Sequence, residues 1–263
     1  MSEVTVVEVP QWRGSGSRTA ERLREGARLL AGMVDAGRRV RVEVDDDLVV
    51  TASRVREAIA RVGDGLVVTA GGDCGVELEP VAAAIKRHGD RLVVVWIDAH
   101  GDLNTPESSP SGAFHGMVLR ALTGDGPAGL VPGDPLDPGR IVLAGVRDLD
   151  APELAFVEER GIRWLTVADS GAALADAVAD IRDDAVVYVH IDLDVLDPEV
   201  FASVGCPTPG GLRPDELLSL VSAVAGRFEV VGLGLMEYEA FGERDQGMLA
   251  GLVEALVEAC LPR

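Results

Sequence analysis

Eight short runs rich in β-branched residues recur along the chain, and this repetition constrains its fold more than any other feature. The runs are VTVVEV, VRVEV, LVVTA, LVVVWI, IVLAGV, IRWLTV, AVVYVHI and EVVGLGL. Most are separated by stretches such as TAERLREGARLLAGMV, in which apolar residues recur at helical spacing. Strands that alternate with helices predict a mostly parallel sheet with helices on both faces, either open or closed into a barrel. We favour the open α/β form.

The chain length predicts a single domain over residues 1–263. A chain of 263 residues is long enough for one large α/β domain. Hydrophobic residues make up 47% and aromatic residues only 4%, so Val, Leu, Ala and Ile must fill the core, as is usual in covered parallel sheets. Residues 104–112 and 124–139 are rich in Pro, Gly, Ser and Asp and predict the longest loops.

The charge of the chain limits its partners. A formal net charge of -20 repels phosphate backbones and anionic lipids, so we expect neither nucleic acid nor membrane and favour a cationic small molecule. The first residues, MSEVTVVEVPQWRGSG, lack the pattern of a signal peptide, and no apolar run is of transmembrane length. Three scattered cysteines do not form a disulfide framework. We therefore expect a cytoplasmic protein with reduced thiols.

Polar residues follow four of the predicted strands. LVVTA ends in GGDCG, LVVVWI in DAHGD, AVVYVHI in DLDVLDP and EVVGLGL in MEYE. Ligands of open parallel sheets bind beyond the carboxyl ends of the strands. These four strand ends are therefore the predicted functional site.

Two of the strand ends have the pattern of a two-metal site. In an extended chain alternate side chains share a face, so Asp98, His100 and Asp102 can converge, as can Asp192 and Asp194. A single such motif is more often a loop start or a helix cap. Two of them would place acids that repel one another at one edge, and a cation relieves that repulsion. Four carboxylates and one imidazole suit Mn²⁺, and carboxylates can bridge two ions about 3.5 to 4 Å apart.

At these positions the chain resembles the ureohydrolases, which include the arginases and agmatinases. The matching stretches are GGDCG at 71–75, DAHGDLNTP with SGAFHGM at 98–117, and DLDVLDP with GCPTPGGL at 192–212. The resemblance implies an open three-layer α/β/α fold around an eight-stranded parallel sheet. It also implies two Mn²⁺ per chain, with a bridging hydroxide that attacks a guanidinium carbon to give urea and an amine. The family commonly forms homo-oligomers, either trimers or hexamers.

The resemblance also implies the metal ligands. One ion would be held by His100 and Asp194, the other by Asp102 and Cys74, with Asp98 and Asp192 bridging them. Cys74 stands where the family has His. A thiolate is a softer ligand, which could favour Zn²⁺ or Fe²⁺, weaken Mn²⁺ binding or leave a single metal. Cys74 could instead be a small buried apolar residue beside an empty site.

Three residues would carry the catalytic roles of the family. His115, after the Gly- and Ser-rich loop, would correspond to the proton-shuttling histidine, and Glu237 to the carboxylate that holds the guanidinium group. Asp102 would take a proton from the hydroxide and pass it to the leaving nitrogen.

Substrate recognition by resemblance leans toward arginine. The residues that would contact the α-carboxylate and α-amino groups are Asn104, Ser111, Asp150 and Glu153. Two positions differ from arginases, since Ala113 replaces an Asn and Cys206 lies in a triplet that is GTP-like in the family. The pocket is therefore expected to have changed.

Two alternatives to a guanidino hydrolase stay open. Cys74 makes a catalytically inactive binding or regulatory protein of the same fold plausible. The run VYVHIDLDVLD could also be the nucleophile strand of an aspartate-based phosphatase, although that motif normally opens its domain and no suitable Ser/Thr, Lys and acid set follows Asp192.

Overall fold

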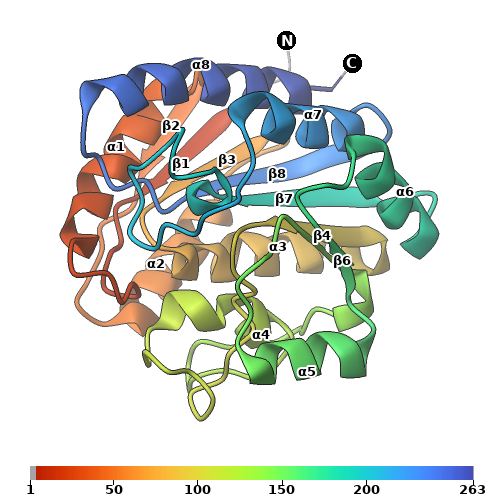
Figure 1. Ribbon diagram of the computed structural model, residues 1–263. Helices are drawn as coiled ribbons and strands as arrows, with labels where there is room; N and C mark the ends of the chain where they lie inside the picture. The colour runs from red at the N-terminus through yellow and green to blue at the C-terminus, as the bar shows by residue number, and fades with distance from the viewer. Residues whose placement is uncertain (1–3, 263) are drawn as a thin grey trace.

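The computed structural model describes residues 4–262 and contains one open, entirely parallel sheet (Figure 1). Its eight strands lie in the order β2-β1-β3-β8-β7-β4-β5-β6. Each of the eight predicted runs overlaps a strand, although only Val40 and Arg41 of VRVEV lie in one, and the open parallel sheet confirms the α/β fold. The strands are β1 (Thr5–Val9), β2 (Arg38–Arg41), β3 (Val67–Gly71), β4 (Leu92–Ile97), β5 (Ile141–Ala144), β6 (Arg163–Leu165), β7 (Val186–Asp192) and β8 (Glu229–Met236).

Helices cover both faces of the sheet and give three layers (Figure 1). One layer consists of α1 (Leu23–Met33), α6 (Gly171–Ile181), α7 (Pro214–Ala225) and α8 (Glu243–Cys260). The other consists of α2 (Leu48–Ile59), α3 (Leu78–His88), α4 (Val118–Leu122) and α5 (Ala151–Arg160). Short 3-10 helices include η2 (Cys74–Glu77), η4 (Phe114–Met117) and η6 (Leu193–Val195).

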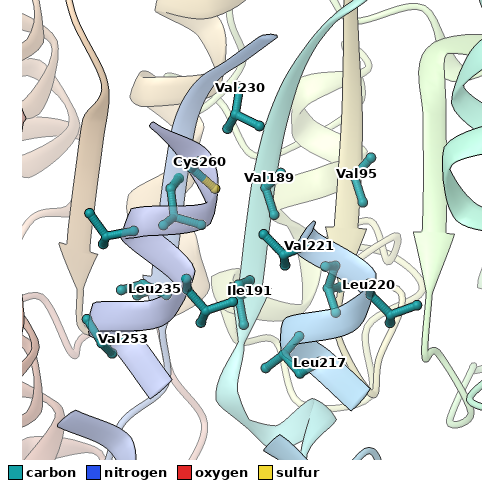
Figure 2. Close-up of a cluster of buried hydrophobic side chains, with 14 of the residues drawn as sticks. Val95, Val189, Ile191, Leu217, Leu220, Val221, Val230, Leu235, Val253 and Cys260 are labelled. Carbon is teal, nitrogen blue, oxygen red and sulfur yellow. The ribbon is translucent and has the colours of Figure 1, made fainter. Parts of the chain in front are cut away.

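Aliphatic side chains fill the space between the sheet and each helical layer. In Figure 2, Val189 and Ile191 of β7 face Leu217 and Val221 of α7, and all four are almost fully buried. Burying a side chain of this size contributes about 1.5 to 3 kcal/mol, so these contacts hold the central strands firmly in register. Aliphatic side chains fill the core, as the low aromatic content of the sequence predicted.

The sheet order places the site. Strands β3, β8, β7 and β4 are consecutive neighbours at its centre, and they are the four strands that end in polar motifs. Because all are parallel, their carboxyl ends meet at one edge. Residues 104–112 contain no helix or strand, and residues 124–139 contain only the start of a short 3-10 helix at Pro138–Arg140, in agreement with the predicted loops. Within residues 4–262, no helix has the length and apolarity needed to cross a bilayer.

Candidate metal centre

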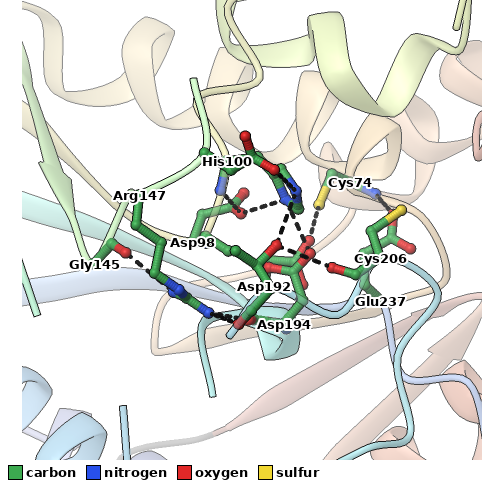
Figure 3. Close-up of polar contacts among 12 residues, drawn as sticks. Cys74, Asp98, His100, Gly145, Arg147, Asp192, Asp194, Cys206 and Glu237 are labelled. Carbon is green, nitrogen blue, oxygen red and sulfur yellow. Dashed lines mark hydrogen bonds and ion pairs between the residues drawn. The ribbon is translucent and has the colours of Figure 1, made fainter. Parts of the chain in front are cut away.

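Asp98 and His100 follow β4 and face the end of β7. Asp98 Oδ1 accepts the backbone N–H of His100 at 2.7 Å, and its Oδ2 accepts the indole N–H of Trp96 at 3.1 Å. His100 Nδ1 lies 3.0 Å from Asp194 Oδ2 and 3.6 Å from Asp98 Oδ1 (Figure 3). The structure therefore brings Asp98, His100 and Asp194 together.

Asp102 reaches the cluster by a different backbone path from the one predicted. The extended chain assumed from the sequence is wrong here, because strand β4 ends at Ile97 and Asp102 has a left-handed φ of 52°. A left-handed non-glycine residue costs about 1 to 2 kcal/mol, a strain that tends to persist at functional sites. Asp102 is buried, and its Oδ2 has no hydrogen-bond partner among the described residues. Burial and the neighbouring Asp98 raise its pKa well above the usual value.

Asp192 and Cys74 connect the ends of β7 and β3. Asp192 is the last residue of β7, and its Oδ1 accepts the N–H of Asp194 at 2.7 Å. The Cys74 thiol donates to Asp192 Oδ2 at 3.2 Å (Figure 3). Cys74 opens η2, and Asp73 caps that helix by accepting the N–H of Gly75 at 3.0 Å. Cys74 therefore points at the carboxylates and not into the apolar core alone.

Glu237 and His115 form a pair on the side of β8. Glu237 follows β8 with a φ of 63°, and its Oε1 accepts the N–H of Cys74 at 3.0 Å. The same oxygen lies 3.1 Å from His115 Nδ1. His115 lies in the 3-10 helix η4, just after the loop to which the sequence assigned it. Two of the three predicted catalytic residues, His115 and Glu237, are thus in contact.

The electrostatics of the cluster favour a bound cation. Burial raises the pKa of Asp98, but hydrogen bonds to His100 and His190 outweigh it and the net pKa is lowered. Burial and the charge of the neighbouring acids raise the pKa of Asp192 well above its usual value, and they raise the pKa of the Cys74 thiol as well. Acids crowded in this way repel one another unless protons or cations neutralise them.

The cluster contains three groups of side chains, and within each group the donor atoms lie within 4.8 Å of one another. They are Cys74, Asp98, Asp102 and His190; Cys74, Asp192 and Glu237; and Asp98, His100 and Asp194. The six predicted metal ligands all belong to these groups. Asp98 is shared between two of them, which suits a bridging carboxylate. Oxygen and nitrogen donors with one sulfur fit divalent transition-metal ions.

The four residues predicted to bind substrate line the cavity above the cluster, and all four already make hydrogen bonds within the chain. Asn104 Nδ2 donates to Asp150 Oδ2 at 2.9 Å, and Asn104 Oδ1 accepts the Ser108 hydroxyl at 2.8 Å. Glu153 accepts the N–H of Asp150 and completes the capping box of α5. Ser111 is exposed at the rim. Ser111 and Asp150 are the two exposed members of this set, although Ser111 Oγ accepts the N–H of Ala113 and Asp150 Oδ2 accepts the Asn104 amide.

The cavity has a volume of about 170 Å³ and is strongly acidic. Its seven carboxylates are those of Asp102, Asp148, Asp150, Glu153, Asp192, Asp194 and Glu237. Within residues 4–262, no Lys or Arg side chain lines it. His100 and His115 also line the cavity, so it contains both imidazoles together with Asp102, Asp192 and Asp194 of the predicted metal ligands.

Comparison with known proteins identifies the family. The family model named Arginase family matches residues 15–261. The chain belongs to the arginase family. An N(omega)-hydroxy-L-arginine amidinohydrolase of Streptomyces lavendulae is 34% identical over 225 residues, which cover 82% of this chain and 80% of that protein. An arginase of Staphylococcus aureus is 40% identical over 151 residues, which cover 54% of this chain and 50% of that protein.

Solved structures agree with this arginase-family fold. The arginase of Bacillus subtilis superposes with a TM-score of 0.83 at 25% identity, over 99% of both chains. The arginase of Entamoeba histolytica, in complex with L-ornithine, gives a TM-score of 0.85 at 24% identity, over 99% of this chain and 98% of that one. Family membership removes the basis for the aspartate phosphatase alternative.

Sequence reasoning missed several residues that support this arginase-family site. Arg147 donates to the backbone oxygens of Asp194 at 3.0 Å and Thr208 at 2.7 Å, and so ties the loop before α7 to the end of β7 (Figure 3). Asp73 Oδ2 accepts the N–H of Gly14 at 2.9 Å, and the Gly14 oxygen in turn accepts the N–H of His115 at 3.0 Å. The segment after β1 therefore supports the backbone of His115 at the edge of the site.

The largest omission is His190, which is fully buried in β7 and belongs to one donor group. Its only sequence signal is that it precedes Asp192 by two residues in a strand, so both side chains share one face.

Proposed function

We propose that this protein is a metal-dependent hydrolase that cleaves a C–N bond of a guanidino compound to give urea and an amine. The observation that carries the proposal is the acidic cavity, which is lined by seven carboxylates and has a cluster of metal-ligand side chains at its base. Such a cavity attracts a guanidinium cation. The relatives with arginase and amidinohydrolase activity support the same reaction class.

The cluster fits a pair of divalent cations, and Mn²⁺ is proposed for the position formed by His100, Asp98 and Asp194. These three residues offer one nitrogen and carboxylate oxygens, which are suitable donors for Mn²⁺. The unpartnered Asp102 Oδ2 is a further observation in favour, because a buried carboxylate oxygen without a donor is costly. When bound, the cations activate water by lowering its pKa.

The chain's own residues divide the remaining work. Glu237 presents a buried carboxylate to the cavity, where it can pair with the planar guanidinium group. Asp102, whose pKa is raised by burial and by the neighbouring Asp98, is placed to accept a proton and return it to the leaving nitrogen. Burial lowers the pKa of His115, but its contact with Glu237 outweighs this and raises it, so His115 can carry protons between the site and the rim.

The far end of the substrate lies among Ser111, Asp148 and Asp150. Two carboxylates there favour an amino group, whereas a substrate carboxylate has only hydroxyl and amide donors to meet it. We therefore propose an α-amino guanidino acid of the arginine type, with Asp148 and Asp150 on the amino group and Ser111 on the carboxylate.

The test is urea release from arginine, N-hydroxyarginine, agmatine and guanidinobutyrate, measured on protein whose metal content is known. Ser111→Ala should raise KM for arginine by about 10-fold, the value of a single polar contact, and leave the KM for agmatine unchanged. Equal losses on both substrates would count against an α-carboxylate contact.

Metal analysis distinguishes the proposed hydrolase from the main alternative, an inactive binding or regulatory protein. Two ions per chain without urea release from any of the four compounds would favour the inactive binding or regulatory protein. Absence of bound metal under all conditions would contradict the proposed hydrolase itself.

A further inference from the structure

His190 is a fully buried histidine whose ring has a defined position and no assigned role. It lies in the central strand β7, between Tyr188 and Asp192 on the same face of the strand. Its ring stacks on Trp96 of β4, with centroids 3.5 Å apart and planes inclined by 15°. Trp96 is itself held in place, because its indole N–H donates to Asp98. The position of the His190 ring against it is therefore fixed.

One nitrogen of the ring faces the metal cluster. His190 Nε2 lies 3.7 Å from Cys74 Sγ and 3.8 Å from Asp98 Oδ2. The contact with sulfur is a long hydrogen bond, and the contact with the Asp98 oxygen is beyond hydrogen-bond distance. They are compatible with two donors that share one ion, and together with Asp102 these atoms lie within 4.8 Å of one another.

The other nitrogen faces a buried carboxylate. His190 Nδ1 lies 3.5 Å from Glu77 Oε2, and neither atom has a hydrogen-bond partner among the described residues. Glu77 is fully buried, and its other oxygen accepts the Tyr188 hydroxyl at 3.2 Å. Gly234 of β8 makes room for it, since a Cβ there would lie 2.4 Å from Glu77 Oε2. A carboxylate on the far nitrogen fixes the tautomer that leaves the near nitrogen free to bind a metal.

We propose that His190 supplies the imidazole of the metal position formed by Cys74, Asp98 and Asp102, with Glu77 as the residue that orients it. The inference rests on the proposed function only in that it requires a metal centre. It assigns this position one thiolate, one imidazole and the carboxylates of Asp98 and Asp102, with Asp192, which accepts the Cys74 thiol, as a carboxylate shared with the other position. The other position, with His100, Asp98 and Asp194, has no sulfur donor.

The proposal accounts for the difference from the family at position 74. The family places its imidazole at position 74, at the end of β3, whereas this chain places a short thiol there and an imidazole on the opposite wall. With 3.7 Å between Cys74 Sγ and His190 Nε2, a longer histidine side chain at position 74 would overlap the His190 ring. Only one imidazole fits at this metal position, and in this chain His190 of β7 provides it.

A sulfur donor changes the preference of this position. Soft thiolate with imidazole favours Zn²⁺ or Co²⁺ over Mn²⁺, whereas the sulfur-free position keeps the donors that suit Mn²⁺. We therefore expect the two positions to select different ions. Binding releases the Cys74 thiol proton to solvent, because the thiolate is the ligand.

The experiment is a Co²⁺ titration of metal-free protein, followed by absorption spectroscopy, which reports thiolate ligation independently of hydrolysis. Wild type should show a sulfur-to-cobalt charge-transfer band, and Cys74→Ser should lose it. Cys260→Ala, at the end of α8 in the apolar core, and Cys206→Ala, in the lining of the cavity, should keep it. Loss of the band in Cys206→Ala and not in Cys74→Ser would assign the wrong thiol and overturn the proposal.

His190 is tested by replacement and by rescue. His190→Ala should weaken Co²⁺ binding at the sulfur position by about 100-fold and Glu77→Gln by about 10-fold, as loss of a ligand and of its orienting partner do. Cys74→His combined with His190→Ala should restore two ions per chain in Mn²⁺. Cys74→His alone should not, because the two rings overlap.

Unchanged Co²⁺ affinity and spectra in His190→Ala would refute the ligand role. The histidine would then be a buried hydrogen-bond partner of the Cys74 thiol. If wild type releases urea while His190→Ala retains both ions, only this inference fails. If wild type binds two ions through Cys74 and His190 but hydrolyses no guanidino compound, only the proposed function fails.

Discussion

At the scale of single residues, Asp192 joins more of the site than any neighbour along β7. One oxygen holds the backbone of Asp194 in place, and the other accepts the Cys74 thiol. Its carboxylate is thus both a support for the turn into η6 and a candidate bridge between the two metal positions. Such a side chain tolerates little change, because its charge and its geometry are used together.

We predict that Asp192→Asn abolishes both metal binding and hydrolysis. An amide keeps the size of the side chain but cannot provide the negative charge shared by two ions. Metal content after gel filtration and urea release should fall together. The matched control is Asp176→Asn, an exposed residue paired with Arg227, which should change neither. Full activity in Asp192→Asn would refute the metal site.

At the scale of elements, the pentapeptide LVVTA occurs twice with two different structures. Residues 48–52 begin helix α2, and residues 66–70 form most of strand β3. The first copy follows Asp47, whose side chain accepts the N–H of Val49 at 2.8 Å and caps the helix. The second copy follows Gly65 and inserts between β1 and β8, where it is largely buried. Neighbouring residues and tertiary contacts therefore override the local β-preference.

We predict that Asp47→Ala lowers the free energy of unfolding by about 1 kcal/mol, the usual value of a helix cap. The equivalent change before the second copy, Asp64→Ala, should have an effect within about 0.5 kcal/mol, as is typical of an exposed residue away from such features. Urea denaturation of both variants, at equal metal loading, makes the comparison. Equal destabilisation by the two substitutions would show that the cap does not stabilise α2.

Much of the fold could be predicted from the sequence, because buried parallel strands leave long aliphatic runs between helices. The strand-end acids could be located for the same reason. The turn at Asp102 could not, since nothing in DAHGD indicates a left-handed backbone. The role of His190 was missed because a single histidine inside an apolar strand resembles a core residue. Its meaning depends on Glu77, which comes from a different segment of the chain.

At the scale of the whole molecule, the buried acids make metal and pH act on the same groups. Burial raises the pKa of Asp102 and of Asp192, and it raises the pKa of Asp73 to about 6. An acid with a raised folded-state pKa binds more protons in the folded state than in the unfolded state. In the metal-free protein, its stabilising contribution is therefore lost as pH rises from about 4 through the raised pKa.

We predict that the increase in Tm caused by divalent metal is larger at pH 8 than at pH 5.5. At the lower pH protons already neutralise part of the cluster and compete with the ions, whereas at the higher pH only the ions relieve the repulsion. Thermal unfolding with and without chelator at both pH values measures the difference. An increase in Tm that is equal at the two values would contradict the assignment of these acids as ligands.

The place of β8 in the sheet has a consequence for biosynthesis. β8 pairs with β3 on one side and with β7 on the other, although it is translated after the other seven strands of this sheet. Until it leaves the ribosome, the nascent chain holds two partial sheets, β2-β1-β3 and β7-β4-β5-β6, each with an open apolar edge at the middle of the future molecule. Open edges of this kind invite pairing with other chains. A polypeptide that ends before residue 229 therefore has both edges exposed, and we expect it to aggregate.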